Sequence, residues 1–353
     1  MYYFDHAAST PPLPCAIEAF LRAPKGNPDS AHTAGRAAKK SLEESREIVA
    51  ACIGAEPEEI YFCSGGTEAN NLVIRTMLKH GAVLYGDTSH ASVWNIQQSY
   101  WDAISRPATG FSVPYVNNET GEILSRNRIV GYHTHYPLLH LDAVAAVGQV
   151  NVFARRFDCD YLTAAGHKFG APQGIGFIYA RKNSPPISPL FRGGGQENSA
   201  RPGTPSVALA AAMAAALKYR VENMRMNLEL MYWTRDYIID NAPSIEGCHI
   251  NVEDFGWDIV PHIISIRFDG IPSAQLLPLL DAQGVCCSAG SACSAGSREP
   301  SRVLMASGLS EKEALETVRI SICPETTQHD AEILLSALKN AVEKLRKLLP
   351  RAR

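Results

Sequence analysis

A lysine and an aspartate, each placed after a short apolar run, are the residues whose types and positions point most directly to chemistry. Lys168 lies between glycines in AGHKFGAP, beside His167 and after the run Tyr161–Thr163. Such a lysine can form a Schiff base if its surroundings disfavour the ammonium form, although a lone loop lysine is more often a plain surface residue. Asp142 ends the earlier run LHLD. A buried carboxylate there needs a cationic partner, and the pyridinium nitrogen of pyridoxal phosphate would supply one.

A glycine-rich turn has the features of a phosphate site. The segment Ser64–Asn70 (SGGTEAN) stands between a predicted strand, Glu59–Cys63, and a helix predicted to start near Glu68. Glycines let the backbone approach a ligand, and a helix N-terminus offers free N–H groups to an anion. Thr67 adds a hydroxyl at the same place. The alternative is a tight turn with an ordinary helix cap.

A third candidate is a thiol in a loop of small residues. Cys293 is the central cysteine of CCSAGSACSAGS, which starts at Cys286, and Arg298 follows this segment. A nucleophilic cysteine must be accessible, and a nearby cation favours its thiolate. A flexible linker with a structural cysteine is the alternative. We expect Cys286 and Cys287 to lie in a strand leading to the loop.

The remaining histidines and cysteines suggest neither a metal site nor a catalytic thiol. His133, His135 and His140 have some metal-like spacing, but Asp142 is their only acidic neighbour, so we predict no metal site. Five cysteines lie in apolar patterns and are expected in the core: Cys15, Cys52, Cys63, Cys159 and Cys248.

Composition limits the function classes. The chain has 353 residues, with 33 basic and 36 acidic side chains and a net charge of −3, so we expect neither nucleic acid nor a membrane surface as a partner. Nine cysteines are too few for a disulfide scaffold of this size. The start MYYFDH has no features of a secretory signal, and the longest apolar stretch, Val207–Leu217, is about half a membrane span. We therefore predict a cytoplasmic protein.

Alternating apolar runs and helical patterns predict an α/β chain with a mostly parallel sheet in the first two thirds. The expected division is a large domain of residues 13–240 and a smaller α+β domain of residues 241–353 joined by residues 1–12. We predict helices at Ser30–Ile53, Pro205–Asn241 and His329–Leu348. Predicted strands besides Glu59–Cys63 are Ala82–Tyr85, Phe111–Val116, Leu138–Leu141, Tyr161–Thr163, Gly176–Tyr179, His249–Val252, Ile263–Arg267 and Thr317–Ile322.

Seven motifs in order along the chain resemble the NifS/IscS-type cysteine desulfurases, which are class V aminotransferases and fold-type I pyridoxal-phosphate enzymes. They are SGGTEANN from Ser64, SHASV from Ser89, VNNETG from Val116, HLDA from His140, GHKFGAPQGIG from Gly166, RPGTP from Arg201 and GSACSAGSREPSRVL from Gly290. The resemblance implies a seven-stranded, mostly parallel sheet in the large domain, a homodimer, and pyridoxal 5'-phosphate as cofactor.

The resemblance also implies roles for individual residues. Lys168 would bind the cofactor covalently, Asp142 would hold its pyridinium nitrogen, and His90 would stack on its ring and assist proton transfer. The other expected cofactor contacts are Gly66, Thr67, Asn118, His167 and, from the partner subunit, Thr204. Cys293 would attack the sulfur of bound L-cysteine, leaving L-alanine and a persulfide for transfer to an acceptor protein.

Three positions depart from the family pattern. Ala145 replaces a glutamine that contacts the phenolic oxygen of the cofactor, Ala165 replaces a serine that contacts its phosphate, and Pro324 stands where an arginine grips the substrate carboxylate. Candidates for that last task are Arg298, Arg302, Arg201 of a partner chain and Asn27. These departures leave two alternatives open: another pyridoxal-phosphate C–S or selenocysteine lyase, or a degenerate homologue that acts as a sulfur-transfer scaffold.

Overall fold

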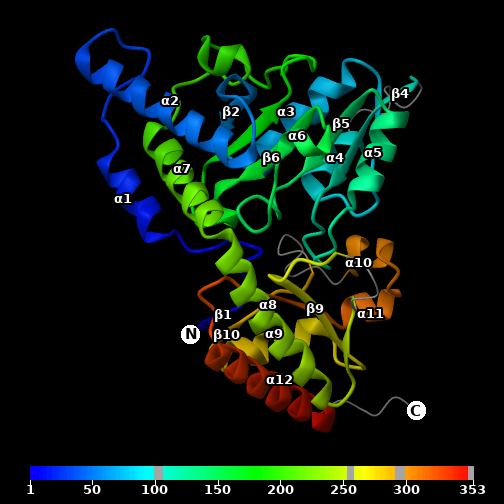
Figure 1. The fold of residues 1–353 in the computed structure, drawn as a ribbon. Coiled ribbons are helices and arrows are strands. Elements are labelled where there is room, and N and C mark those ends of the chain that lie inside the picture. Colours follow the sequence, from blue (N-terminus) through cyan, green and yellow to red (C-terminus); the bar gives the residue numbers. More distant parts are fainter. Residues whose placement is uncertain (99–105, 253–257, 291–298, 349–353) are drawn as a thin grey trace. The chain divides into compact units, whose positions relative to one another are not determined.

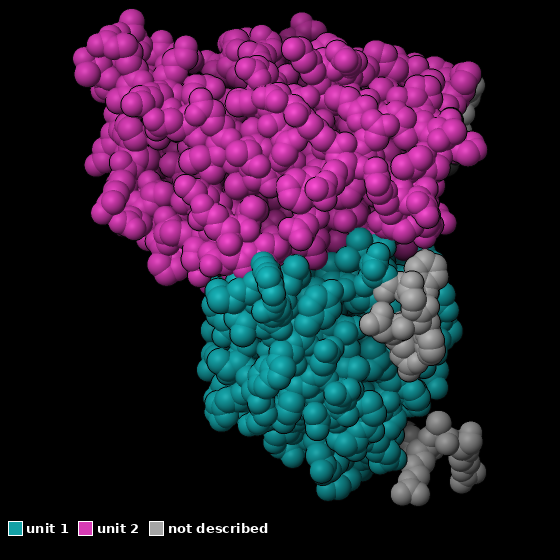
Figure 2. Space-filling model, viewed as in Figure 1, with its two compact units in different colours: residues 1–9, 117–123, 225–353 teal, residues 10–116, 124–224 magenta. Residues whose placement is uncertain are grey.

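The computed structural model describes residues 1–98, 106–252, 258–290 and 299–348 (Figure 1). The chain forms two compact units, coloured separately in Figure 2. Unit 2 consists of Thr10–Val116 and Leu124–Met224, and unit 1 of Met1–Ser9, Asn117–Ile123 and Arg225–Arg353. No helix in these described ranges is long and apolar enough to cross a bilayer.

Unit 2 is built on a six-stranded mixed sheet. Its strand order is β2 (Ile60–Cys63), β7 (Gly176–Ala180), β6 (Tyr161–Ala165), β5 (Leu138–Asp142), β4 (Ala108–Pro114) and β3 (Ala82–Tyr85). Strands β3 to β6 run parallel, whereas β7 is antiparallel to both of its neighbours. We expected seven strands. The described residues form six, and residues 99–105, between helix α4 (Ala91–Gln98) and β4, lie outside the described ranges.

The parallel strands place two of the predicted residues at one edge of this sheet. All side chains of β5 and β6 are buried, and Asp142 pairs in register with Thr163. Asp142 ends β5, and the short 3-10 helix η3 (Gly166–Lys168) follows the end of β6 directly. Because carboxyl ends of parallel strands meet at the same edge, Asp142 and Lys168 follow neighbouring strand ends.

Helices cover both faces of the sheet (Figure 1). Helices α1 (Pro14–Arg22), α2 (Thr33–Ile53) and α7 (Val207–Glu222) pack together. Helix α2 ends at Gly54, whose left-handed backbone (φ 67°) donates to the carbonyls of the last turn. Helix α3 (Gly66–Leu78) packs its apolar side chains against β6 and β7. The remaining helices of the unit are α4, α5 (Arg126–His135) and α6 (Ala154–Phe157).

Unit 1 contains an antiparallel sheet of β11 (Thr317–Ser321), β9 (Ile263–Phe268) and β8 (Cys248–Ile250), while β1 (Tyr2–Tyr3) pairs in parallel with β10 (Val285–Cys286). Its helices are α8 (Met224–Asn241), α9 (Ser273–Asp281), α10 (Arg302–Ala306), α11 (Glu311–Leu315) and α12 (Gln328–Leu348).

The long helix predicted over Pro205–Asn241 is two helices, interrupted at Asn223. Met231 and Ile238 of α8 join the apolar core of unit 1 together with Phe4 and Leu334. Helix α8 therefore belongs to unit 1, and the two units divide at Met224, before the position near residue 240 that the sequence suggested.

Candidate active site

The backbone of Lys168 is fixed by side chains from two other segments. Its carbonyl oxygen accepts hydrogen bonds from Gln149 Nε2 at 2.6 Å and Thr10 Oγ1 at 3.3 Å. The Lys168 side chain is half-buried. A tethered backbone beneath a half-buried lysine limits the positions that its amine can reach, as a covalent attachment site requires.

Asp142 is buried and accepts hydrogen bonds from two donors. Its Oδ1 accepts from the backbone N–H of Val144 at 3.0 Å, and its Oδ2 accepts from Asn70 Nδ2 at 2.9 Å. Only 7% of Asp142 is exposed. Two donors fix the plane of the carboxylate, so it can direct a lone pair at a third, ligand-borne donor.

His90 stands immediately before α4 and caps it. Its Nδ1 accepts from the backbone N–H of Ser92 at 3.1 Å and lies 2.8 Å from Ser92 Oγ. Ser92 Oγ in turn accepts from Asn70 Nδ2 at 2.8 Å. Asn70 therefore joins Asp142 to His90. We did not single out Asn70 from the sequence, although a polar residue on the apolar face of a predicted helix could have indicated it.

The predicted phosphate turn is tightly packed. Gly65 has φ 150°, and α3 begins at Gly66. A Cβ at Gly66 would lie 2.8 Å from Val144 Cγ2, so the site admits backbone alone. Thr67 is exposed in the first turn of α3. The exposed Thr67 places a hydroxyl in the first helical turn, where backbone N–H groups favour an anion.

His167 is held neutral by its surroundings. Burial, and then the charge of Lys168, lower the pKa of His167 to about 4. Its Nδ1 is buried and has no hydrogen-bond partner among the described residues. An unsatisfied buried nitrogen is costly, which favours a bound group as its partner.

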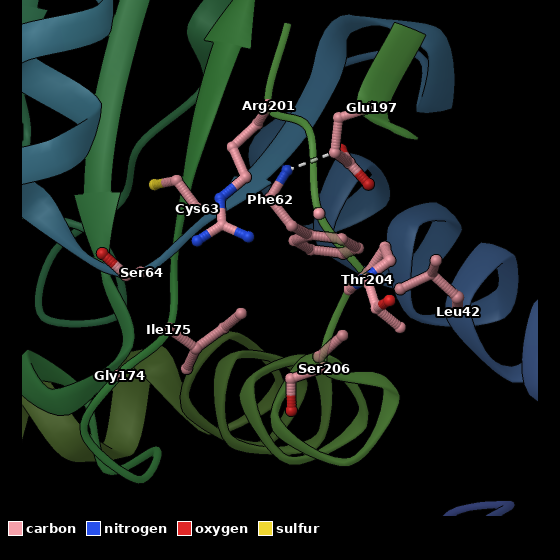
Figure 3. A pocket seen from close by; sticks show the side chains of 13 residues that line it. Leu42, Phe62, Cys63, Ser64, Gly174, Ile175, Glu197, Arg201, Thr204 and Ser206 are labelled. Carbon is pink, nitrogen blue, oxygen red and sulfur yellow. Dashed lines mark hydrogen bonds between the residues drawn. The ribbon is translucent and has the colours of Figure 1, made fainter. Parts of the chain in front are cut away.

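A cavity of about 210 Å³ lies beside the turn, and Figure 3 shows the Arg201 side chain pointing into it. Arg201 Nε binds Glu68 Oε1 at 3.0 Å, and Glu68 also accepts from the Ser64 N–H at 2.7 Å. The pKa of Glu68 lies below its ordinary value, because these hydrogen bonds outweigh the opposing effect of burial. Thr204 is exposed and lines the same cavity.

The segment leading to Arg201 and Thr204 is anchored by a buried ion pair. Arg46 binds both carboxylate oxygens of Glu197, at 2.8 and 2.7 Å, and the Phe62 N–H donates to Glu197 at 2.8 Å (Figure 3). Glu197, Asn198 and Ser199 are all left-handed, with φ of 47°, 53° and 65°. Such backbone persists only where contacts over-determine it, so the Arg46–Glu197 pair fixes the course of this segment. Nothing local in the sequence indicated it.

Two of the three histidines considered as metal ligands, His140 and His135, have other partners. His140 is buried between Ser112 and Thr163, and His135 Nδ1 lies 2.7 Å from the Gly131 carbonyl. Across the ranges that the structure describes, no three His, Cys, Asp or Glu side chains gather where they could hold a metal ion.

The imidazoles of His140 and His167 predict a fold that is sensitive to acid. Burial lowers the pKa of His140 to about 4, against a smaller opposing effect of Asp142, and His167 has a similar value. The unfolded chain binds these protons near pH 6.5, so it holds more protons than the folded chain between about pH 6.5 and 4. We expect the urea midpoint to be constant above that window and to fall as pH decreases through it. His140→Gln should flatten the dependence, and an equally steep profile in this variant would contradict the assignment.

The chain matches the family described as aminotransferase class-V over residues 2–101 and 93–334. An IscS-like cysteine desulfurase of Mycobacterium tuberculosis is 33% identical over 391 residues, covering 98% of this chain and 98% of that protein. A cysteine desulfurase IscS of Dictyoglomus turgidum is 32% identical, covering 99% and 96%. The chain belongs to the cysteine desulfurases of the class V aminotransferase family.

Solved structures agree with this cysteine desulfurase fold. A structure described as a NifS-like protein superposes with a TM-score of 0.86 at 27% identity and covers 98% of this chain and 99% of that chain. SspA in complex with cysteine superposes with a TM-score of 0.76 at 27% identity, covering 93% and 100%.

Three further predicted residues lie outside the described part of unit 2. Cys293 and Arg298 lie outside the described residues. Asn118 belongs to unit 1, where its carbonyl oxygen accepts from Arg319 Nη1 at 2.9 Å, and Arg319 pairs with Asp5 at 3.0 Å.

The positions that depart from the family pattern hold small or uncharged side chains. Ala165 is 1% exposed at the end of β6, and Pro324 is half-buried after β11. Among the candidates for the carboxylate, Arg201 is engaged by Glu68, Asn27 Oδ1 caps the N–H of Asp29, and Arg302 begins α10.

Proposed function

We propose that this desulfurase holds pyridoxal phosphate on Lys168 and converts L-cysteine to L-alanine, leaving a persulfide on Cys293. The observation that supports the cofactor assignment best is the buried Asp142 carboxylate, held by two donors at the end of β5, with Lys168 after the end of β6. An acid next to a reactive lysine at one edge of a parallel sheet suits a pyridinium nitrogen and its carbonyl substituent.

The residues present fit this cofactor. The unpartnered Nδ1 of His167, the N-terminus of α3 and the Thr67 hydroxyl offer donors for a phosphate. Neutral His167 can donate a hydrogen bond without adding charge. Gly66 fits this turn because a side chain there would collide with Val144. The methyl side chains of Ala145 and Ala165 carry no polar group to replace the glutamine and serine of relatives, so we expect weaker cofactor binding.

When bound, pyridoxal phosphate supplies an electron sink. Asp142 keeps the pyridinium nitrogen protonated, and Lys168 holds the group and moves a proton at Nζ. The Nδ1 of His90 is taken by Ser92, so His90 can exchange a proton only at Nε2.

The bonds and electrons of the sulfur transfer balance with the Cys293 thiolate, the substrate cysteine and a proton alone. The Cys293 thiolate attacks the sulfur of cysteine, an S–S bond forms, and the C–S bond breaks with its electron pair left on the substrate carbon. That carbon takes up a proton to give alanine. The persulfide sulfur then passes to an acceptor protein.

The phosphate site extends over two subunits of a homodimer, because Thr204 of a partner subunit completes it.

Incubation of the purified protein with cysteine tests the proposal. We expect a visible absorbance band from the lysine-bound cofactor, with alanine and protein-bound persulfide formed in equal amounts. The band with pyruvate or free sulfide but no persulfide would indicate a C–S lyase instead. Absence of the band would leave the sulfur-transfer scaffold as the better description.

Pro324 predicts weak binding of free cysteine. Without a cation at this position, the substrate carboxylate loses a charged hydrogen-bonded pair, which corresponds to about 10- to 100-fold in affinity. We expect Pro324→Arg to lower the Michaelis constant by about this factor while kcat changes little. The matched control is Glu325→Arg, which adds the same side chain at the exposed neighbouring position. A low-micromolar Michaelis constant in the unchanged protein would show that another group already binds the carboxylate.

A further inference from the structure

Four buried polar side chains form a continuous hydrogen-bonded row behind Asp142. Ser112 on β4, His140 on β5 and Thr163 on β6 are 0% exposed, and Asn70 on α3 is 1% exposed. Ser112 Oγ lies 2.8 Å from His140 Nδ1, His140 Nε2 lies 3.0 Å from Thr163 Oγ1, and Thr163 Oγ1 lies 2.6 Å from Asn70 Oδ1. The row crosses three adjacent parallel strands and ends on the helix that follows the phosphate turn.

The chemistry of the groups gives this row a single direction. A carboxylate only accepts, so the Asn70 amide nitrogen faces Asp142 and the Asn70 oxygen must accept from the Thr163 hydroxyl. Thr163 has then used its proton and accepts from His140 Nε2–H. A neutral imidazole has one donor and one acceptor, so His140 Nδ1 accepts from Ser112. Burial, which lowers the pKa of His140 to about 4, keeps this ring neutral at pH 7.

A second series of hydrogen bonds runs from Asn70 through Ser92 to His90, and its donors and acceptors can be assigned in the same way. Asn70 Nδ2 donates its second proton to Ser92 Oγ, which leaves the Ser92 hydroxyl proton for His90 Nδ1. The Ser92 N–H points at the same nitrogen. Both donors assign the ring proton of neutral His90 to Nε2.

We propose that Asn70 is a positioning residue that orients Asp142 and His90 together, and that Thr163 and His140 lock its amide in the required orientation. A reversed amide would place its oxygen against the Asp142 carboxylate and remove the donor from Ser92. The role of Asp142 and His90 in desulfurase chemistry rests on the proposed function. The direction of the hydrogen bonds in the row does not depend on that function.

Nuclear magnetic resonance of the full chain with ¹⁵N-labelled histidine tests the row without turnover. We expect His140 and His90 to be neutral at pH 7.5, each with its proton on Nε2. Thr163→Val keeps the shape of the side chain but removes the hydroxyl that accepts from His140, so His140 should show mixed tautomers. The control Thr163→Ser keeps the hydroxyl and should keep the proton of His140 on Nε2. A proton on His140 Nδ1 in the unchanged protein, or no change in Thr163→Val, would overturn the proposal.

Cofactor affinity gives the second readout. Asn70→Ala should weaken binding of pyridoxal phosphate by about 10- to 100-fold, the loss expected for one hydrogen bond to a charged group. Thr163→Val should weaken it less, and Thr163→Ser should resemble the unchanged protein. Unaltered affinity in Asn70→Ala would refute the positioning role. If the unchanged protein has the predicted tautomers but binds no cofactor, the proposed function is wrong, whereas the assigned direction of the hydrogen bonds in the row is confirmed.

Discussion

Replacement of Lys168 by alanine is expected to abolish covalent cofactor attachment and to reduce alanine formation by at least about 10²- to 10⁴-fold, the range for loss of a positioned acid–base group. The physical reason is that the tethered Lys168 backbone presents the amine after the end of β6, the strand that pairs with β5, and Asp142 ends β5. Borohydride reduction followed by peptide mapping should label Lys168 in the unchanged protein and no lysine in Lys168→Ala.

Lys182→Ala is the matched control, because Lys182 is an exposed lysine in the same unit. It should keep the label and the activity. A label on another lysine in the unchanged protein, or full activity in Lys168→Ala, would contradict the assignment.

Cys293→Ser should leave the visible band of the cofactor intact while persulfide formation falls by about 10³-fold or more, as for removal of an attacking nucleophile. A serine hydroxyl has nearly the size of the thiol but cannot accept the sulfur. The measurement is cyanide-releasable sulfane sulfur on the protein after incubation with cysteine. Cys286→Ser is the control, since it makes the same substitution on β10 and should keep persulfide formation. Persulfide that survives in Cys293→Ser would make Cys286 the better candidate.

Burial disqualifies most other thiols as nucleophiles. It raises the pKa of Cys63, Cys159 and Cys248 to about 12 each, and that of Cys52 and Cys323 to about 11. The pKa of Cys287 is also raised by its burial. A thiol with such a pKa is almost wholly protonated at neutral pH, and the thiolate is the reactive form.

The sequence alone determined strands β5 and β6, which lead to Asp142 and Lys168. The apolar runs before Asp142 and Lys168 predicted β5 and β6 within two residues at each end, because a buried strand needs a short, continuous apolar run. The predicted strand Ala82–Tyr85 is β3, and α2 ends at Ile53, as predicted from its amphipathic pattern. Such features depend on neighbouring residues, so they can be predicted from local pattern.

Only the tertiary structure decided how the polar residues connect. Asn70 reaches Asp142, Thr163 and Ser92, none of which is near it in the chain, because the sheet register and the packing of α3 bring them together. Arg46 likewise holds the left-handed Glu197 from a distant helix. No local pattern encodes these contacts, since a hydrogen bond between distant segments exists only after the burial of apolar side chains has fixed the strands and helices that present its donor and acceptor.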